Sequence, residues 1–90
     1  MRLDKYLKVS RLIKRRTVAN EACDAQRVSV NGKAAKAGYE VKPGDVISIR
    51  FASGTVAVEV LSVKEQVKKD EAALLYRSLP ADTNPQAAGN

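Results

Sequence analysis

Apolar positions near the start of the chain recur every three or four residues, with charged side chains between them. This spacing is typical of one face of a helix. The apolar positions are Leu3, Tyr6 and Leu7, and Ser10 falls at the next position of the same spacing. A helix of about two turns is marginal in isolation, so it must be stabilised by packing of its apolar face. The pattern predicts a short amphipathic helix at residues 2–10.

A second helix is predicted from Thr17 to about Ala25. The Thr17 hydroxyl is a candidate N-cap for the first free amides of this helix. Small side chains then follow at helical spacing, and they would let two helices approach closely. They are Val18, Ala19, Ala22 and Cys23. Gln26 stands where many helices end in a glycine of left-handed conformation. We therefore expect either that Gln26 adopts this conformation at a cost in backbone energy or that the helix ends in a different geometry.

Alternation of apolar and polar residues predicts a first hairpin after the second helix. Val28 and Val30 alternate with polar neighbours, as in a short half-buried strand. Asn31 and Gly32 come next, and both tolerate positive φ, which makes this pair a strong signal for a two-residue turn. A weak partner strand is therefore expected at about residues 33–36.

The rest of the chain predicts a second hairpin and a final helix. A Pro-Gly turn at residues 42–45 leads to strands at 46–51 and 56–60. Residues 64–79 have helical spacing, either as a docking element for a partner or, as we favour, as a helix packed across the sheet. Residues 80–90 have no periodicity and are expected to form a disordered tail.

Together these elements predict one α+β domain at residues 1–79. Two short N-terminal helices would pack on a small, mainly antiparallel sheet, followed by the C-terminal helix. A chain of 90 residues is long enough for one small core but not for a separate catalytic domain as well.

Positive charge is concentrated in the first half of the chain. Residues 1–51 carry twelve Lys and Arg against five Asp and Glu, whereas residues 52–90 have a net charge of −1. The first sixteen residues alone reach +6, which equals the net charge of the whole chain. A small basic domain can simply be a soluble one, but this segregation favours a polyanionic partner. Nucleic acid is favoured over an acidic membrane as this partner, because the basic residues lie on a folded domain rather than on a tail.

Several classes of function find no support in the sequence. It contains no His, no Gly-rich phosphate loop, no paired metal-ligand motif and no nucleophile elbow. The single Cys23 cannot form an internal disulfide and is interpreted as a small core residue. No apolar run approaches the roughly twenty residues that span a bilayer. We therefore expect a cytoplasmic, non-enzymatic protein without cofactor or metal.

Asp4 is the only acid among the first sixteen residues. With cations around it, its carboxylate should be well stabilised rather than tuned for proton transfer. It either pairs with Lys8 one turn later or orients Arg2 or a neighbouring Arg toward phosphate. The sequence leaves both alternatives open.

The basic elbow between the two helices is the predicted functional surface. There Arg2 and Lys5 can converge with Arg15 and Arg16, since an Arg guanidinium can bind two phosphate oxygens and still stack on a base. Exposed amides near Thr17 add a site for an anion. Further cations that could extend this surface are Arg11, Lys14, Lys33 and Lys36.

The residues around the elbow favour structured RNA as the ligand. The aromatic residues are too scattered to stack several unpaired bases. The helix after the elbow shows no face suited to reading base edges, which makes duplex DNA less suitable. We expect recognition of RNA through its backbone and shape, with an affinity that falls steeply as salt rises.

Three segments in order resemble the S4 RNA-binding domain. They are Arg2-Leu-Asp-Lys-Tyr-Leu with Arg11 and Arg15-Arg16-Thr17, then Arg27-Val-Ser-Val-Asn-Gly, then Val41-Lys-Pro-Gly-Asp-Val-Ile. The combination is specific, although each piece alone is weak. Gln26 departs from the Gly that is common before the first strand of this domain.

The opening Met1-to-Thr17 segment and Lys68-Lys69-Asp70-Glu71-Ala72-Ala73 also resemble the bacterial RqcP family, which is related to the heat-shock protein fifteen family. This resemblance implies binding to large ribosomal subunits that carry peptidyl-tRNA after a stalled ribosome splits. It implies contacts with ribosomal RNA and tRNA, and cooperation with the factor RqcH in alanine tailing. It also places Arg2, Asp4 and Arg16 at the centre of RNA contact.

Other functions remain open at this stage. The chain could be a heat-shock-type factor that recognises large subunits without supporting tailing, or a ribosome-assembly or structural ribosomal component. An accessory subunit that lends RNA affinity to a separate enzyme is a further alternative. We expect the protein to be a monomer when it is not bound to the ribosome.

Overall fold

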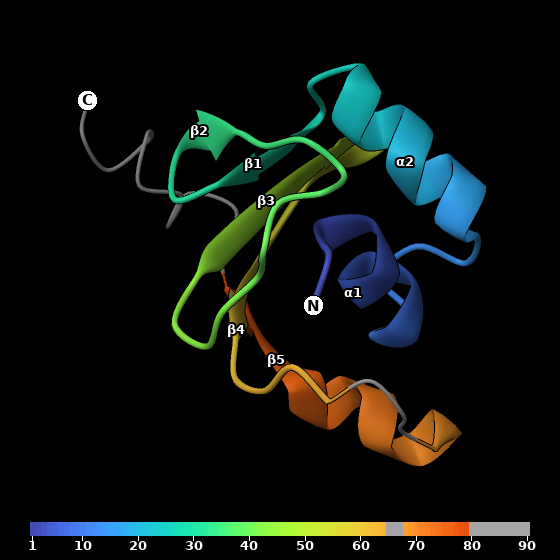
Figure 1. The fold of residues 1–90 in the computed structure, drawn as a ribbon, viewed down its shortest axis with the longest axis vertical. Helices are drawn as coiled ribbons and strands as arrows, with labels where there is room; N and C mark the ends of the chain where they lie inside the picture. Colours follow the sequence, from blue (N-terminus) through green and yellow to red (C-terminus); the bar gives the residue numbers. More distant parts are fainter. Residues whose placement is uncertain (65–67, 80–90) are drawn as a thin grey trace.

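The structure is a computed structural model in which residues 1–64 and 68–79 are described. Along these residues, two α-helices and one 3₁₀ helix combine with a five-stranded sheet (Figure 1). In chain order the elements are α1 (Leu3–Val9), α2 (Arg16–Asp24), β1 (Val28–Val30), β2 (Lys33–Ala34), β3 (Val46–Phe51), β4 (Gly54–Val60), η1 (Lys69–Leu75) and β5 (Tyr76–Leu79). The predicted α+β class is confirmed.

The sheet has the strand order β2-β1-β3-β4-β5, and each neighbouring pair is antiparallel. Val30 faces Lys33 in the β1–β2 ladder, so Asn31 and Gly32 form the predicted two-residue turn, with φ of 54° and 86°. The Asn31 side chain also accepts a hydrogen bond from the amide of Val46 at 3.0 Å. This bond ties the first hairpin to the start of β3.

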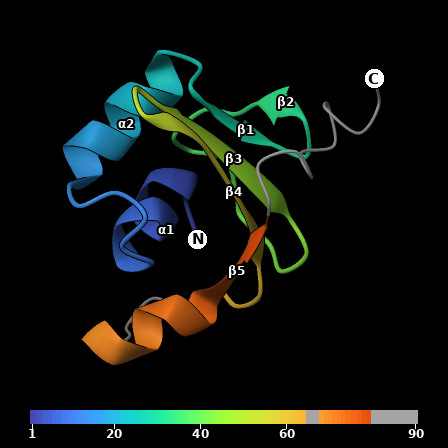
Figure 2. The ribbon, with the colours of Figure 1, turned by 180° about the vertical axis from the view of Figure 1, so that it is seen from behind.

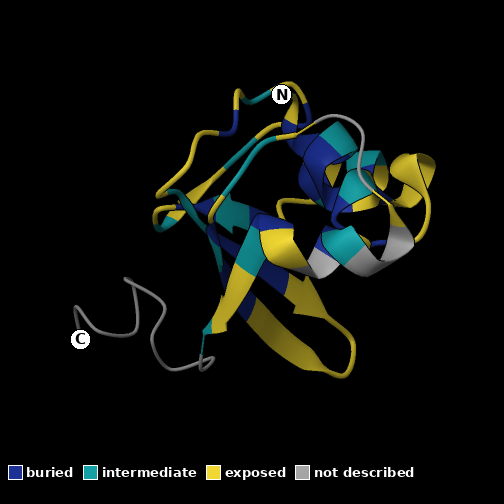
Figure 3. Cartoon of the chain, turned by 90° about the horizontal axis from the view of Figure 1, so that it is seen from below, coloured by how far each residue is buried: buried dark blue, intermediate teal, exposed yellow. Residues whose placement is uncertain are grey.

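The helices lie on one side of the sheet, and α1 lies within its concave face (Figures 1 and 2). Buried residues are concentrated where helices and sheet face each other (Figure 3). Helix α1 contributes three fully buried side chains, and α2 contributes Ala19 and Cys23. The α1 residues are Leu3, Tyr6 and Leu7. The predicted apolar face of the first helix and the core position of Cys23 are therefore confirmed.

Helix α2 ends in the left-handed turn that the sequence left uncertain. Gln26 adopts a φ of 61°. Its amide donates to the carbonyl of Cys23 at 3.0 Å, and the amide of Arg27 donates to that of Ala22 at 2.9 Å. These two bonds form a Schellman motif. Gln therefore takes the conformation that usually selects Gly, at a cost in backbone energy.

The start of α2 differs from the prediction. Arg15, with φ −124° and ψ 135°, is the extended residue before the helix, and it makes no side-chain cap. Thr17 lies inside the first turn, so the predicted Thr17 N-cap is wrong. A cap contributes only about 1 kcal/mol. The earlier start includes Arg16 in the helix, and from there its side chain reaches Asp4.

The C-terminal segment also differs from the predicted helix. Helix η1 ends at Leu75, and the residues that follow form β5, in which Tyr76 pairs with Val60 of β4. The unpaired edge of β4 offers these residues backbone partners that a longer helix would not. Ala72 and Leu75 are buried, which supports the packed alternative for η1. Residues 65–67 of the predicted helix and the predicted tail at 80–90 lie outside the described residues.

Candidate nucleic-acid interface

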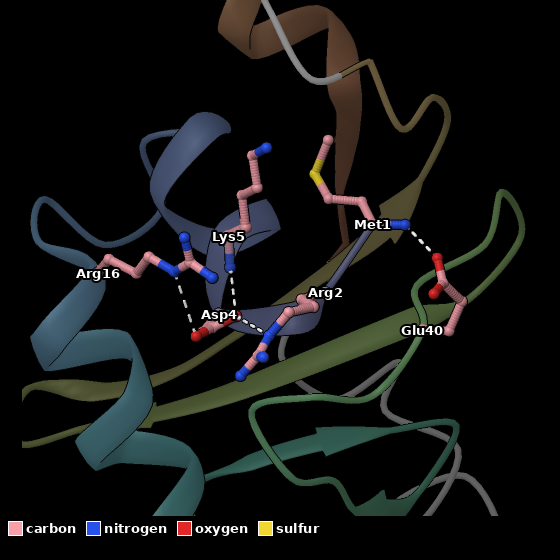
Figure 4. A network of polar contacts seen from close by, with 6 residues as sticks. All are labelled: Met1, Arg2, Asp4, Lys5, Arg16 and Glu40. Carbon is pink, nitrogen blue, oxygen red and sulfur yellow. Dashed lines mark hydrogen bonds and ion pairs between the residues drawn. The ribbon is translucent and has the colours of Figure 1, made fainter.

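Asp4 joins the two N-terminal helices through their arginines (Figure 4). Its Oδ1 accepts a hydrogen bond from Nε of Arg2, and its Oδ2 accepts one from Nε of Arg16, both at 3.3 Å. The amide of Lys5 donates to Oδ1 at 2.8 Å. We call Arg2, Asp4 and Arg16 the arginine cluster. Of the four cations predicted to converge at the elbow, Arg2 and Arg16 meet at this carboxylate.

Backbone bonds to the segment before β3 fix the position of this cluster. The amide of Leu3 donates to the carbonyl of Tyr39 at 2.8 Å, and that of Asp4 donates to Ala37 at 3.1 Å. An isolated bridge pairs Arg2 with Glu40, and the Glu40 carboxylate also forms an ion pair with the Met1 ammonium group (Figure 4). The first amides of α1, which have no partner within the helix, are in this way bonded to a neighbouring segment.

The environment of Asp4 keeps its carboxylate ionised. Burial leaves its side chain 3% exposed, and this desolvation by itself would raise the pKa. The hydrogen bonds from Arg16 and the Lys5 amide, with the charges of Arg16 and Arg2, outweigh it, so the pKa is below its ordinary value. Of the two alternatives from sequence, the structure shows the pairing with arginines.

Both guanidinium groups of the cluster remain accessible. The side chains of Arg2 and Arg16 are 55% and 49% exposed, and each contacts Asp4 through Nε. Their terminal nitrogens extend beyond the carboxylate (Figure 4). Because a guanidinium has five donors in a rigid fork, the outer edge of each can still bind a phosphate.

A hollow of about 410 Å³ lies beside the cluster, lined by Asp4, Arg16, Thr17, Asn20 and Glu21. Asn20 and Glu21 were not predicted as binding residues, yet both line this hollow. Their positions three and four residues after Thr17 place them on the same helix face. Because Thr17 was a candidate binding residue, the same spacing could have identified Asn20 and Glu21 as further candidates.

The other predicted residues lie in separate places. Arg11, Lys14 and Arg15 are exposed on the linker between α1 and α2, and Arg11 has a φ of 63°. Lys33 and Lys36 line a second, larger hollow of about 850 Å³ beside the β1–β2 hairpin. Arg16 lines the hollow beside the arginine cluster and does not line this one. The structure therefore joins Arg2, Asp4 and Arg16, with Lys5 bonded to Asp4 through its backbone amide. It places Arg11, Lys14 and Arg15 on the linker, and Lys33 and Lys36 at the β1–β2 hairpin.

Within residues 1–64 and 68–79, no group of three or more His, Cys, Asp or Glu side chains could hold a metal ion. No helix in the same residues is long and apolar enough to cross a membrane.

Comparison with known proteins gives consistent matches. The family model described as S4 domain matches residues 1–47. The "RQC P-site tRNA stabilizing factor" of Halalkalibacterium halodurans is 60% identical over 84% of this chain and 86% of its own, and that of Bacillus subtilis is 56% identical over 88% and 92%.

A solved structure resembles the whole fold. Trimeric heat shock protein 15 of Vibrio cholerae superimposes with a TM-score of 0.83 at 28% identity, covering 98% of this chain and 91% of its own. The S4 match spans both helices, the first hairpin and the start of β3, which together carry the arginine cluster. The chain therefore belongs to the S4 domain family and, within it, to the family of RQC P-site tRNA stabilizing factors.

Proposed function

We propose that this protein is a non-catalytic RNA-binding factor of ribosome quality control that stabilises P-site tRNA. The arginine cluster is the observation that carries the proposal. A buried, ionised Asp4 fixes two half-exposed guanidinium groups on either side of its carboxylate (Figure 4). The names of the relatives from H. halodurans and B. subtilis supply the biological context.

The mechanism is positional rather than chemical. Each Arg uses Nε to contact Asp4, which leaves the outer edge of the guanidinium for a phosphate oxygen. Because Asp4 already orients both side chains, little conformational entropy is lost when RNA binds. Phosphate contacts of this kind set the register of a bound RNA without reading its sequence. The affinity should fall steeply with salt, as counterion release requires.

The finer assignment follows the family resemblance. The ligand is the large ribosomal subunit carrying peptidyl-tRNA, contacted through its ribosomal RNA and the tRNA. The bound factor supports alanine tailing of the stalled nascent chain by RqcH. The protein acts in the cytoplasm on the ribosome, is a monomer away from it, and needs no cofactor.

A pull-down of the tagged protein at moderate salt tests this function. We expect large subunits with tRNA and RqcH, and few small-subunit proteins. Arg16→Ala should abolish the association without unfolding the protein, because the buried Asp4 carboxylate keeps its hydrogen bonds from Arg2 and from the Lys5 amide. Arg77→Ala is the matched control. It removes one exposed Arg from β5, where Arg77 pairs with Glu59, and should leave the association intact. Retention of subunits by a folded Arg16→Ala variant would contradict the proposal.

A second candidate is a heat-shock-type factor that recognises large subunits without supporting tailing. The likeness to V. cholerae heat shock protein 15 favours it. Large subunits recovered without RqcH would support this candidate. Near-stoichiometric occupancy of translating ribosomes would instead indicate a ribosome-assembly or structural component.

A further inference from the structure

The sheet has a second face, which points away from the helices. Helices α1 and α2 lie on the concave face (Figures 1 and 2), and Val28 and Ile49 are buried against them. Among residues 1–64 and 68–79, no helix covers the opposite face, which we call the outer face. Successive side chains of a strand alternate between faces. The sequence neighbours of these two buried residues therefore point to the outer face.

Two of these neighbours are Arg27 and Arg50, and they lie opposite each other. Val28 pairs with Ile49 in the β1–β3 register, so the next pair along the ladder is Arg27 with Arg50. The amide of Arg50 donates to the carbonyl of Arg27 at 2.9 Å, as that register requires. In such a hydrogen-bonded pair the Cα atoms are about 5.5 Å apart and both side chains point to the same face. Both residues are exposed, so the outer face carries two adjacent guanidinium groups.

This arginine pair has no acidic partner in the described part of the chain. No carboxylate there forms an ion pair with Arg27 or Arg50. Like charges at directly opposite positions of an antiparallel pair are destabilising. The sheet therefore maintains a local repulsion that a neutral side chain at either position would relieve.

The other end of the outer face gives a contrast. There Arg77 of β5 lies opposite Glu59 of β4, and the two form an ion pair. The β4 residue opposite Arg50 is Thr55, which is exposed and carries no charge. A Thr hydroxyl can donate a hydrogen bond to a phosphate oxygen. The outer face thus neutralises its arginine at one end and leaves two cations beside a hydroxyl at the other.

We propose that the outer face binds the phosphate backbone of a second RNA segment at Arg27 and Arg50. Each guanidinium presents a rigid fork of donors, which fits two oxygens of one phosphate. Two such forks on neighbouring strands can hold one phosphate together or two phosphates in succession. The inference rests on the proposed function, because it adds a second RNA contact to the same protein.

The two RNA contacts face different ways. The arginine cluster lies at the starts of α1 and α2, on the concave face, whereas Arg27 and Arg50 point from the outer face. A short RNA hairpin bound at the cluster therefore leaves the outer face free for another. Because the sheet lies between the two sites, the protein holds two RNA segments at a fixed separation.

The number of RNA molecules bound per chain tests the proposal. The probe is one short RNA hairpin, in excess over the protein, and native mass spectrometry counts the hairpins in each complex. We expect two hairpins on the wild type. The double variant Arg27→Gln, Arg50→Gln should bind one, with the affinity of the first binding step unchanged. A wild type that binds only one hairpin would overturn the proposal.

Salt dependence tests whether the outer face contacts phosphate. In an Arg16→Ala background the outer face is the remaining site, and anisotropy of a labelled hairpin measures its affinity. The logarithm of this affinity should fall against that of the salt concentration with a slope of about −1.4 or steeper, the value for two contacts at about 0.7 each. Adding Arg27→Gln and Arg50→Gln should abolish this residual binding. A slope near zero would contradict a phosphate contact.

The double variant Arg77→Gln, Lys42→Gln is the matched control. It also removes two exposed cations, but Arg77 is paired with Glu59, and Lys42 belongs to the turn before β3. Both binding steps should stay unchanged in this control. Circular dichroism verifies folding, and the Arg27→Gln, Arg50→Gln variant should be at least as stable as the wild type because a repulsion is removed. An equal loss of RNA from both double variants would mean that net charge alone governs binding, and would overturn the proposal.

The outcomes separate this inference from the proposed function. If the wild type binds one hairpin and Arg16→Ala abolishes that binding, only the outer-face site is wrong. If Arg16→Ala changes neither binding step, the proposed function fails, and the arrangement of two RNA segments fails with it. Vesicles containing phosphatidylserine test the other anionic partner. Vesicle binding that is lost in Arg27→Gln, Arg50→Gln, with the number of bound hairpins unchanged, would assign the outer face to a membrane and overturn the proposal.

Discussion

Arg16 donates a hydrogen bond from Nε to Oδ2 of Asp4 at 3.3 Å, although twelve residues separate them. Helix α1 provides the acid and α2 the base, and the basic linker between them is exposed. One carboxylate thus serves as the common anchor for Arg2 and Arg16. In a strongly basic segment, this single acid determines where two of the cations point.

Replacing Asp4 with Asn tests whether this anchoring matters more than net charge. Asp4→Asn makes the surface more positive, yet we expect RNA affinity to fall about tenfold because two arginine side chains lose their restraint. Asp24→Asn is the matched control, since it removes one exposed carboxylate charge at the far end of α2, outside this hollow, and should not weaken binding. Fluorescence anisotropy with a labelled RNA hairpin measures both. Tighter binding by both variants would mean that charge alone governs affinity.

The same residue predicts a dependence of stability on pH. The folded pKa of Asp4 is below its ordinary value of 3.8. The ionised group therefore stabilises the fold above that value, and the contribution is lost as the pH falls through the folded pKa. Urea unfolding between pH 2 and 6 should show the wild type losing its advantage over Asp4→Asn below about pH 3.8. A constant difference over the whole range would contradict the low pKa. Because the pKa of Glu40 is also lowered, the comparison between variants is needed to isolate Asp4.

Two residues in left-handed conformations give a matched test of function against stability. Arg11 has a φ of 63° and Gln26 a φ of 61°. Arg11→Gly and Gln26→Gly should each raise the free energy of unfolding by up to about 1 kcal/mol, because Gly adopts this conformation without steric cost. Arg11 is a candidate RNA contact and Gln26 is not. Only Arg11→Gly should therefore weaken RNA binding, and an equal effect of both on affinity would remove Arg11 from the interface.

Tyr6 links α1 to the C-terminal segment. Its hydroxyl, fully buried, donates to the carbonyl of Leu75 at 2.7 Å. Tyr6→Phe should cost about 1 kcal/mol, the usual net value of such a bond. The loss is limited because the Leu75 carbonyl also accepts from the amide of Leu61 at 2.8 Å. Hydrogen exchange should show faster opening at β5 in this variant, while RNA binding stays unchanged. Unaltered exchange there would mean that other contacts hold this segment.

The local pattern of apolar, polar and turn-forming residues was sufficient to predict most elements of the fold. The spacing of Leu3, Tyr6 and Leu7, the Asn31-Gly32 pair and the alternation from Val46 onward each correspond to an element of the structure. Such features depend on neighbours in sequence, whose preferences for helix, turn or strand are local. The convergence of Arg2 and Arg16 was also predicted, because an elbow between two amphipathic helices turns their charged faces the same way.

Features that depend on distant partners could not be read from the sequence. The strand at Tyr76–Leu79 forms on the edge of β4, and a helical pattern gives no sign of that edge. The choice of Asp4 between Lys8 and the arginines was likewise open, because α2 had to pack on α1 before Arg16 came within reach. The sequence by itself determined which residues are basic, apolar or turn-forming. Only the tertiary structure decided which of them meet, because hydrogen bonds and ion pairs act over a few ångströms whatever the separation along the chain.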